Sequence, residues 1–247
     1  MIGKIDFFIC GTQKGGTSAL DNYLRLHPEI CMADQKEIHF FDDESHFLTS
    51  NVNYDRLHCH FSPQKTNKLF GEATPIYMYW ENVPKRLWEY NPNALLIILL
   101  RNPIERAFSH WQMEYNKGKE KHRFLHSIFL ELFKRSYHKK EQHRIFSYID
   151  RSFYLPQLNR IWEYFPKSQT LLIKSEQLKT NPNQTLARVF DFLNTEAINI
   201  EEPLLINTNN YTYNMHHFER ILLKYIFKNE VKQLENQLSW DCSSWLQ

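Results

Sequence analysis

The sequence predicts an α/β fold in which helices flank a central parallel β-sheet of the P-loop type, in one domain over residues 1–247. Three observations predict this fold. An apolar run at residues 7–10 leads through a glycine-containing loop into a helical pattern. The continuous apolar run at 94–100 is typical of a parallel strand that is buried on both faces. A further apolar run at 170–173 again lies between two helical patterns.

The loop at residues 11–18 reads Gly-Thr-Gln-Lys-Gly-Gly-Thr-Ser and holds three of the six glycines in the chain. A strand, a glycine-containing loop and a helix start form an anion site, because amides and the helix dipole point at the ligand. Two glycines and Ser18 match the nucleotide-binding P-loop, but Thr17 stands where that motif has its lysine, and Lys14 lies inside the loop. We therefore expect a phosphate site that does not bind the γ-phosphate of ATP.

The composition excludes few classes of protein. The chain has 30 basic and 28 acidic residues, a net charge of +2, which gives no reason to expect nucleic acid or a membrane as a partner. The four cysteines are scattered and form no Cys-x-x-Cys pair, so reduced thiols in a cytoplasmic protein are expected. Because the strand pattern begins by residue 5, we expect no secretory signal, and no apolar run in the sequence reaches transmembrane length.

Periodicity and capping signals predict the remaining elements. A strand is expected at 69–73, and helices are expected over residues 17–27, 103–117, 154–165 and 182–193, in the first part of 120–151, and from 218 onward. Asn102, Pro103 and Glu105 have the spacing of an N-cap, a first helical position and a capping-box partner. Asn181 and Pro182 repeat the N-cap signal before a later helix.

Two charged residues follow apolar segments at predicted strand ends. Glu72 is a candidate general base, because the carboxyl ends of parallel strands face the ligand crevice. The alternative for Glu72 is a capping or salt-bridged surface glutamate. Arg101 lies where the strand at 94–100 passes into a helix, a position that favours an anion. A metal-dependent kinase or GTPase would have an aspartate there.

The segment at residues 36–42 reads Lys-Glu-Ile-His-Phe-Phe-Asp and admits two interpretations. Its polar residues could belong to a site, or the segment could be a surface loop that Phe40 and Phe41 hold in place. The nearby His58-Cys59-His60 offers two histidines without a third ligand, which falls short of a zinc site.

Together these motifs resemble the sulfotransferases that use 3′-phosphoadenosine 5′-phosphosulfate (PAPS). The form is more similar to the Golgi heparan-sulfate sulfotransferases and their small bacterial relatives than to the cytosolic phenol and steroid enzymes. The resemblance covers most of the chain, and five motifs follow in the family's order: 11–18, 36–42, 71–77, 99–109 and 154–178.

The resemblance implies how PAPS is bound. Lys14 would stabilise the charge on the oxygen that leaves the sulfuryl group, and cations with a helix dipole would neutralise the donor without a metal. Arg101 and Ser109 would bind the 3′-phosphate, and Asn210 and Tyr211 would close over the nucleotide. The loop residues that would hold the 5′-phosphate are Lys14, Gly15, Gly16, Thr17 and Ser18.

The resemblance also implies how the acceptor is handled. Glu72 would take the acceptor proton, and His39 is a second candidate base. Acceptor contacts are expected from Lys36, His39, Phe40 and Tyr77. The chain departs from the family at Ser152, where a glycine is common, and at 207–213, where the family's basic loop has no clear match.

The expected activity is transfer of the sulfuryl group of PAPS to a hydroxyl or amine. We expect a small-molecule acceptor from natural-product biosynthesis rather than a carbohydrate, and neither nucleic acid nor a membrane as partner. Two alternatives remain, a P-loop kinase acting on a small metabolite and a non-catalytic nucleotide-binding module.

Overall fold

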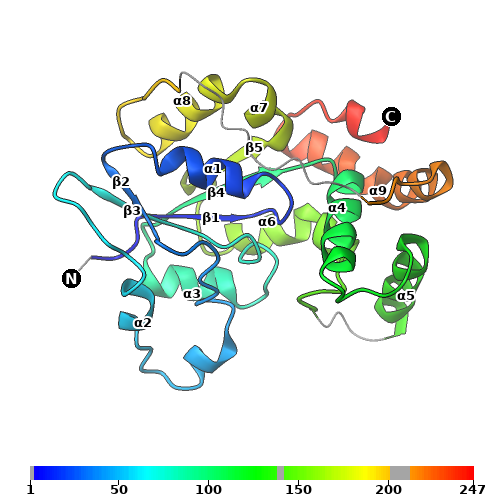
Figure 1. Ribbon diagram of the computed structural model, residues 1–247, viewed down its shortest axis with the longest axis horizontal. Coiled ribbons are helices and arrows are strands. Elements are labelled where there is room, and N and C mark those ends of the chain that lie inside the picture. Colours follow the sequence, from blue (N-terminus) through cyan, green and yellow to red (C-terminus); the bar gives the residue numbers. More distant parts are fainter. Residues whose placement is uncertain (1–2, 138–141, 201–211) are drawn as a thin grey trace. The chain divides into compact units, whose positions relative to one another are not determined.

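The computed structural model describes residues 3–137, 142–200 and 212–247, and its centre is a parallel β-sheet (Figure 1). The five strands lie in the order β2-β3-β1-β4-β5, and each pairs in parallel with its neighbours. The strands are β1 (Phe7–Gly11), β2 (Ile30–Met32), β3 (Leu69–Ala73), β4 (Leu95–Leu100) and β5 (Thr170–Lys174). The predicted α/β fold with a central parallel sheet is confirmed.

Helices follow most of the strands along the chain. The α-helices are α1 (Thr17–Leu24), α2 (Asp55–His58), α3 (Val83–Tyr90), α4 (Pro103–Asn116), α5 (Phe124–Tyr137), α6 (Tyr154–Trp162), α7 (Ser175–Thr180), α8 (Pro182–Phe192) and α9 (His217–Leu238). Short 3-10 turns lie at Glu44–Phe47, Asp150–Ser152, Lys167–Gln169 and Ser243–Leu246. The sequence did not predict β2, α2, α3 or α7, which are too short or too polar for a clear periodic pattern.

The chain divides into two compact units. Residues 1–100 and 160–207 form the first unit, and residues 101–159 and 208–247 form the second. That the whole of 1–247 is one domain stays a prediction.

The first unit has a core on each face of its sheet. Helices α1, α7 and α8 lie on one side of the sheet and α3 on the other (Figure 1). On the α1 side, aliphatic residues of the strands pack against Leu20, Leu186 and Phe190. On the other side, aromatic rings pack edge to face, with the ring of Phe41 5.7 Å from that of Tyr77. Burial on both faces explains why the strands read as continuous apolar runs.

The pairing of the strands brings two of the predicted site segments together. In the parallel register Phe8 of β1 lies opposite Glu72 of β3, so both strands end at the same edge of the sheet. The loop at 11–18 follows β1 at this edge, and Thr74 follows β3. The sheet therefore determines which loops can share a site.

The start of α4 in the second unit has the predicted N-cap residue but lacks the predicted capping box. The Asn102 side-chain oxygen accepts a hydrogen bond from the Ile104 amide at 2.9 Å, and Pro103 is the first helical residue, as predicted. Glu105, however, forms an ion pair with Arg220 at 2.7 Å instead of closing a capping box. Arg220 is far from Glu105 in the sequence, but it offers the Glu105 carboxylate a positively charged partner.

A second predicted cap is confirmed in position, with Asn181 as the N-cap residue, but not in its side-chain bond. Helix α8 begins at Pro182, as expected, but the Asn181 side chain makes no capping bond. The adjacent Asn183 instead bonds to both the amide and the carbonyl of Ile200, at 3.0 and 3.1 Å. Those contacts tie α8 to the segment that follows it.

Candidate functional site

The loop at 11–18 turns tightly between β1 and α1. The Gly15 amide donates to the Thr12 carbonyl at 2.7 Å, and the Thr12 amide donates to the Leu99 carbonyl at 2.9 Å. Lys14 and Gly16 have left-handed backbones, with φ of 68° and 95°. A side chain is strained in that conformation, which glycine adopts freely, so Gly16 suits the position before the helix.

The helix start presents amides that nothing else uses. Within the described residues, the N–H groups of Gly16, Thr17 and Ser18 have no hydrogen-bond partner, and α1 has no side-chain cap. Gly16 and Ser18 are exposed, whereas Thr17 is buried. Three unpaired amides at the positive end of a helix have the geometry that suits an anion, so the phosphate site expected from the sequence stays a prediction here.

Gly15, unlike the three residues that follow it, has an amide that is already paired within the loop. Its amide already bonds within the turn, and a Cβ atom here would lie 2.8 Å from both the Leu99 and Thr12 carbonyl oxygens. No side chain fits in that space. The structure therefore explains this glycine by close packing. Its predicted bond to a phosphate stays a prediction.

Glu72 lies at the end of β3 with its side chain fully buried. The Thr74 hydroxyl donates to Oε1, and Oε2 has no hydrogen-bond partner within the described residues. Burial raises the pKa of the Glu72 carboxyl to about 8, although the Thr74 hydroxyl, the Ile38 backbone amide and the charge of His39 act in the opposite direction. A carboxyl with a pKa near 8 can exchange a proton close to neutral pH.

The 36–42 segment crosses the carboxyl end of β3. The Glu37 amide donates to the Ala73 carbonyl at 3.0 Å, which ties the segment to the residue after Glu72. Glu37 and His39 both have left-handed backbones, with φ of 62° and 60°. Strained backbone of this kind is held only where the surrounding contacts enforce it, and it is frequent at functional sites.

Histidine 39 lies between two carboxylates. Its Nδ1 is 3.0 Å from Oδ2 of Asp42, which is fully buried, and its Nε2 is 3.8 Å from Oε2 of Glu37. The Lys36 ammonium lies 2.7 Å from Oε1 of Glu37. The side chains of His39 and Glu37 remain 42% and 40% exposed, so both can meet a ligand.

Phe40 and Tyr77, the predicted acceptor contacts, are both buried. The Phe40 ring stacks on His46 with the centroids 4.5 Å apart. The Tyr77 hydroxyl accepts a bond from the Phe41 amide at 3.4 Å, and burial with the nearby Glu72 charge raises the pKa of Tyr77. In this structure both rings pack in the core, as the loop interpretation expects. Their contact with an acceptor stays a prediction.

The predicted 3′-phosphate residues belong to the second unit. Arg101 directly follows β4 and is partly buried, and Tyr154 donates to its carbonyl at 2.7 Å. Ser109 lies on α4 and is 1% exposed. The predicted nucleotide contacts Asn210 and Tyr211 lie outside the described residues.

Glu37 and Asp42 are site residues that the sequence pattern does not single out. Within the 36–42 motif it predicts roles for Lys36, His39 and Phe40 only. The spacing of three residues between His39 and Asp42 was the available signal, since a carboxylate that orients a histidine is a common arrangement. The left-handed turns that bring Glu37 back to His39 leave no such pattern.

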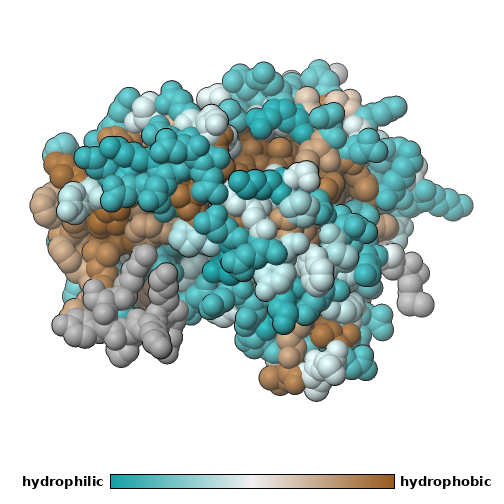
Figure 2. Space-filling view, turned by 180° about the vertical axis from the view of Figure 1, so that it is seen from behind, coloured by the Kyte–Doolittle hydropathy of each residue, from teal (hydrophilic) through white to brown (hydrophobic). Residues whose placement is uncertain are grey.

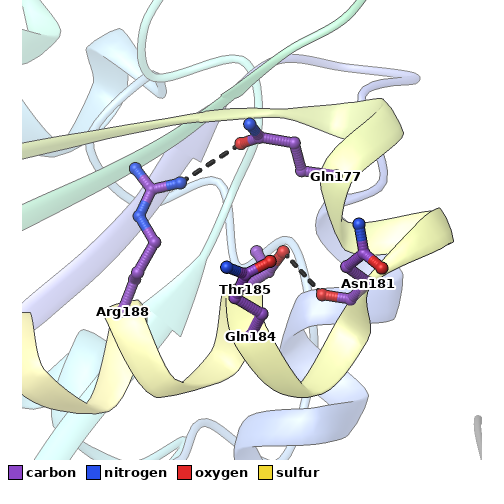
Figure 3. Close-up of a pocket in the computed structure, with 5 residues that line it drawn as sticks. All are labelled: Gln177, Asn181, Gln184, Thr185 and Arg188. Carbon is purple, nitrogen blue, oxygen red and sulfur yellow. Dashed lines mark hydrogen bonds between the residues drawn. The ribbon is translucent and has the colours of Figure 1, made fainter.

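The pocket drawn in Figure 3 lies away from these residues. It has a volume of about 120 Å³ and lies between α7 and α8, lined by Gln177, Asn181, Gln184, Thr185 and Arg188. Two dashed bonds cross it, from Arg188 to Gln177 and from Thr185 to the Asn181 carbonyl. None of the predicted site residues lines it.

The described residues can be compared with the sequence expectations about cysteines, metal sites and membrane spans. All four cysteines are free. Among residues 3–137, 142–200 and 212–247 there is no cluster of three metal-binding side chains, and the two histidines at 58 and 60 belong to no such cluster. No helix in the described part of the chain has the length and hydrophobicity needed to cross a membrane.

Comparison with known proteins identifies the family. The family model described as "Sulfotransferase domain" matches residues 4–238, and the chain therefore belongs to this family of enzymes. A crystal structure of a sulfotransferase from Alicyclobacillus acidocaldarius superposes with a TM-score of 0.82 over 100% of both chains, at 26% identity. The resemblance drawn from the five motifs is confirmed.

Relatives of known activity match part of their own length. Heparan sulfate glucosamine 3-O-sulfotransferase 5 of Mus musculus is 33% identical over 187 residues, which are 75% of this chain and 52% of that protein. The chain thus spans about half the length of this curated relative. A mouse sulfotransferase complexed with PAP has the same fold, with a TM-score of 0.57 at 12% identity over 93% of this chain and 86% of that one.

The buried Glu72 gives a prediction about stability and pH. Its pKa rises from 4.5 to about 8 on folding, so between these values the folded chain keeps a proton that the unfolded chain loses. Stability from this group therefore falls as the pH rises from 4.5 to 8. We expect Glu72→Gln to raise the free energy of unfolding, relative to the wild type at the same pH, more at pH 8 than at pH 5. The difference between the two pH values should be on the order of 1–3 kcal/mol.

The measurement is urea unfolding of both proteins at the two pH values. Glu163→Gln, at an exposed position, is the matched control and should show no such difference. An equal effect of Glu72→Gln at both pH values would contradict the assigned pKa.

Proposed function

We propose that this chain transfers the sulfuryl group of PAPS to an acceptor hydroxyl or amine and releases adenosine 3′,5′-bisphosphate (PAP). One observation carries the proposal: the P-loop keeps three unpaired amides at the start of α1, but has Thr17 in place of the Walker lysine and Lys14 within the turn. Family membership supports it. PAPS is the donor that the family implies.

In the proposed reaction the bond between sulfur and the oxygen on the 5′-phosphate breaks, and a bond from sulfur to the acceptor oxygen or nitrogen forms. The departing oxygen keeps the electron pair, and Lys14 stabilises its charge. The amides of Gly16, Thr17 and Ser18 hold the 5′-phosphate, with Gly15 shaping the turn. Placement and charge stabilisation account for most of the rate in such a transfer.

Two carboxylates compete for the role of base. Glu72, the base predicted from sequence, has a pKa near 8, which suits proton transfer, but no surface through which an acceptor could touch it. Glu37 is partly exposed, and His39 and Lys36 hold it in place. We therefore assign proton removal to Glu37, with His39 and Asp42 orienting it, and keep Glu72 as the competing assignment.

The acceptor that we propose differs from the small molecule expected from the sequence. The curated relative named for heparan sulfate glucosamine favours a sugar hydroxyl as the acceptor. A sulfotransferase domain from the curacin biosynthetic pathway has the same fold, with a TM-score of 0.55 at 15% identity, but a likeness at that level concerns the fold alone. We put the carbohydrate hydroxyl first. The natural-product acceptor and the cytoplasmic location stay predictions.

The donor is tested by thermal unfolding with added nucleotides. PAP should raise the midpoint by several degrees at concentrations well above its Kd, whereas ATP with Mg²⁺ should have little effect, because only the bound state is stabilised. A larger effect of ATP with Mg²⁺ would favour the kinase. No effect of either nucleotide would overturn the donor assignment.

Arg101 and Ser109 are proposed to bind the 3′-phosphate. Arg101→Ala should weaken binding of PAP by roughly 10- to 100-fold, because a charge-assisted bond to phosphate is lost, and should leave 5′-AMP binding almost unchanged. Isothermal titration calorimetry measures both. Arg188→Ala, at a residue with its own bond to Gln177, is the control. Equal losses for both nucleotides would contradict the assignment.

The base is tested by comparing two matched variants. Glu37→Gln should lower kcat by about 10²–10⁴-fold, the usual range for general base catalysis, whereas Glu72→Gln should lower it much less. Transfer from PAPS to a panel of sugars and small hydroxylated compounds is read by mass spectrometry. Lys14→Ala serves as a reference for lost chemistry and Lys85→Ala, on the exposed side of α3, as the surface control. The reverse order would restore Glu72 as the base.

A further inference from the structure

The two units of the chain differ strongly in charge. The second unit, 101–159 with 208–247, contains 16 basic and 10 acidic residues, whereas the first contains 14 and 18. A net charge of +2 for the chain therefore hides +6 on one unit and −4 on the other. Such asymmetry is a feature of proteins that bind anionic surfaces.

Burial makes the surface of the second unit more basic still. Five of its acidic side chains are buried within the described residues, as against two of its basic ones, Arg106 and Arg151. The buried acids are Glu114, Glu120, Glu131, Glu219 and Glu230. Several of them bond to backbone amides, as Glu131 does with Ile149 at 2.9 Å. These acidic side chains make their contacts inside the unit, whereas most of the lysines of the same unit face solvent.

The same unit exposes most of the large apolar side chains. Of the eleven such side chains among the described residues, all but Leu26, Leu48 and Trp88 belong to it. Figure 2 shows hydrophobic side chains gathered at the left margin, where α5 and the start of α9 lie in this reversed view. Single exposed apolar residues are ordinary, but such a concentration marks an interaction surface.

Helix α5 is apolar on two opposite faces. Phe124 and Ile128 face the interior of the unit, whereas Phe129, Leu130 and Phe133 point away and are 50%, 38% and 62% exposed. A helix that is apolar all round is normally covered all round. Exposed basic residues flank the outer face, with Lys121 and Arg123 before the helix and Lys134 within it.

Helix α9 repeats this arrangement. Phe218, Ile221 and Tyr225 follow one another at helical spacing on the side opposite the buried Leu223 and Phe227. Tyr225 is 81% exposed. Lys228 and Lys232 continue the same face and are exposed. Both helices pack against α4, and they extend to the same side of it in Figure 1.

We propose that the outer faces of α5 and α9 form a peripheral docking surface for an anionic lipid bilayer. Phenylalanine, leucine and isoleucine on convex helices enter the boundary between head groups and acyl chains, while the flanking lysines and arginines meet lipid phosphates and carboxylates. The proposal departs from the sequence expectation of no membrane partner, which rested on the charge of the whole chain. It does not depend on the proposed sulfuryl transfer.

Two other occupants fit the observations less well. A second copy placed face to face would bring two units of +6 charge together, which costs energy at low salt. Single-stranded nucleic acid stacks its bases on aromatic rings in a basic groove. Aromatic rings are present on both faces, but they lie on the outside of convex helices and not in a groove, and Leu130 and Ile221 among them offer no ring.

The proposal is tested by vesicle co-sedimentation of the full chain. We expect binding to phosphatidylcholine vesicles that contain about 30 mol% phosphatidylserine at about 0.1 M salt, and little binding to pure phosphatidylcholine or at about 1 M salt. Phe129→Ser with Phe133→Ser should weaken partitioning by at least about tenfold, because two apolar anchors are lost. Lys228→Glu with Lys232→Glu should weaken it through charge alone.

Leu48→Ser with Trp88→Ser is the matched control, because these exposed apolar residues belong to the first unit. All variants should keep the wild-type unfolding midpoint and the response to PAP. Absence of wild-type binding to the anionic vesicles, or an equal loss in the control, would overturn the proposal. A dimer in light scattering that Phe129→Ser with Phe133→Ser dissolves would assign the face to a second copy. Oligonucleotide binding that the same variants abolish, without vesicle binding, would assign it to nucleic acid.

Discussion

The site depends first on the packing of the P-loop against the end of β4. The Thr12 amide bonds to the Leu99 carbonyl, and the turn brings Gly15 so close to the same oxygen that no Cβ fits. This contact holds the loop in the one path that leaves Gly16, Thr17 and Ser18 with unpaired amides. A central strand buried on both faces provides a rigid support for it. The geometry of the proposed anion site is thus a consequence of sheet packing.

A second constraint is the burial of charge beside this loop. Glu72 and Asp42 are fully buried, and His39 reaches Asp42 from a strained left-handed turn. Buried carboxyls are costly unless bonds or nearby cations compensate, so the fold tolerates them at the expense of stability. The raised pKa of Glu72 measures part of that cost. The buried Glu72 and the partly exposed Glu37 form an unequal pair, which allows different roles for chemically similar groups.

The two units also divide the properties of the surface. The acidic first unit contains the P-loop and the buried carboxyls, whereas the basic second unit contains Arg101, Ser109 and the exposed faces of α5 and α9. A sulfotransferase that acts on an anionic or membrane-borne acceptor would benefit from a basic, apolar surface that raises the local concentration of enzyme.

The sequence by itself determined the α/β fold, the glycine-containing loop between β1 and α1, and the family. These follow from local signals, since an apolar strand, a glycine turn and a capped helix each leave a pattern in neighbouring residues. Only the tertiary structure decided how accessible each candidate is. It buried Glu72, Phe40 and Tyr77, turned Glu37 toward His39, and used the Gly15 amide within the turn. Burial and side-chain pairing depend on contacts between residues far apart in the chain, or on backbone turns without a repeating pattern, and no local spacing encodes them.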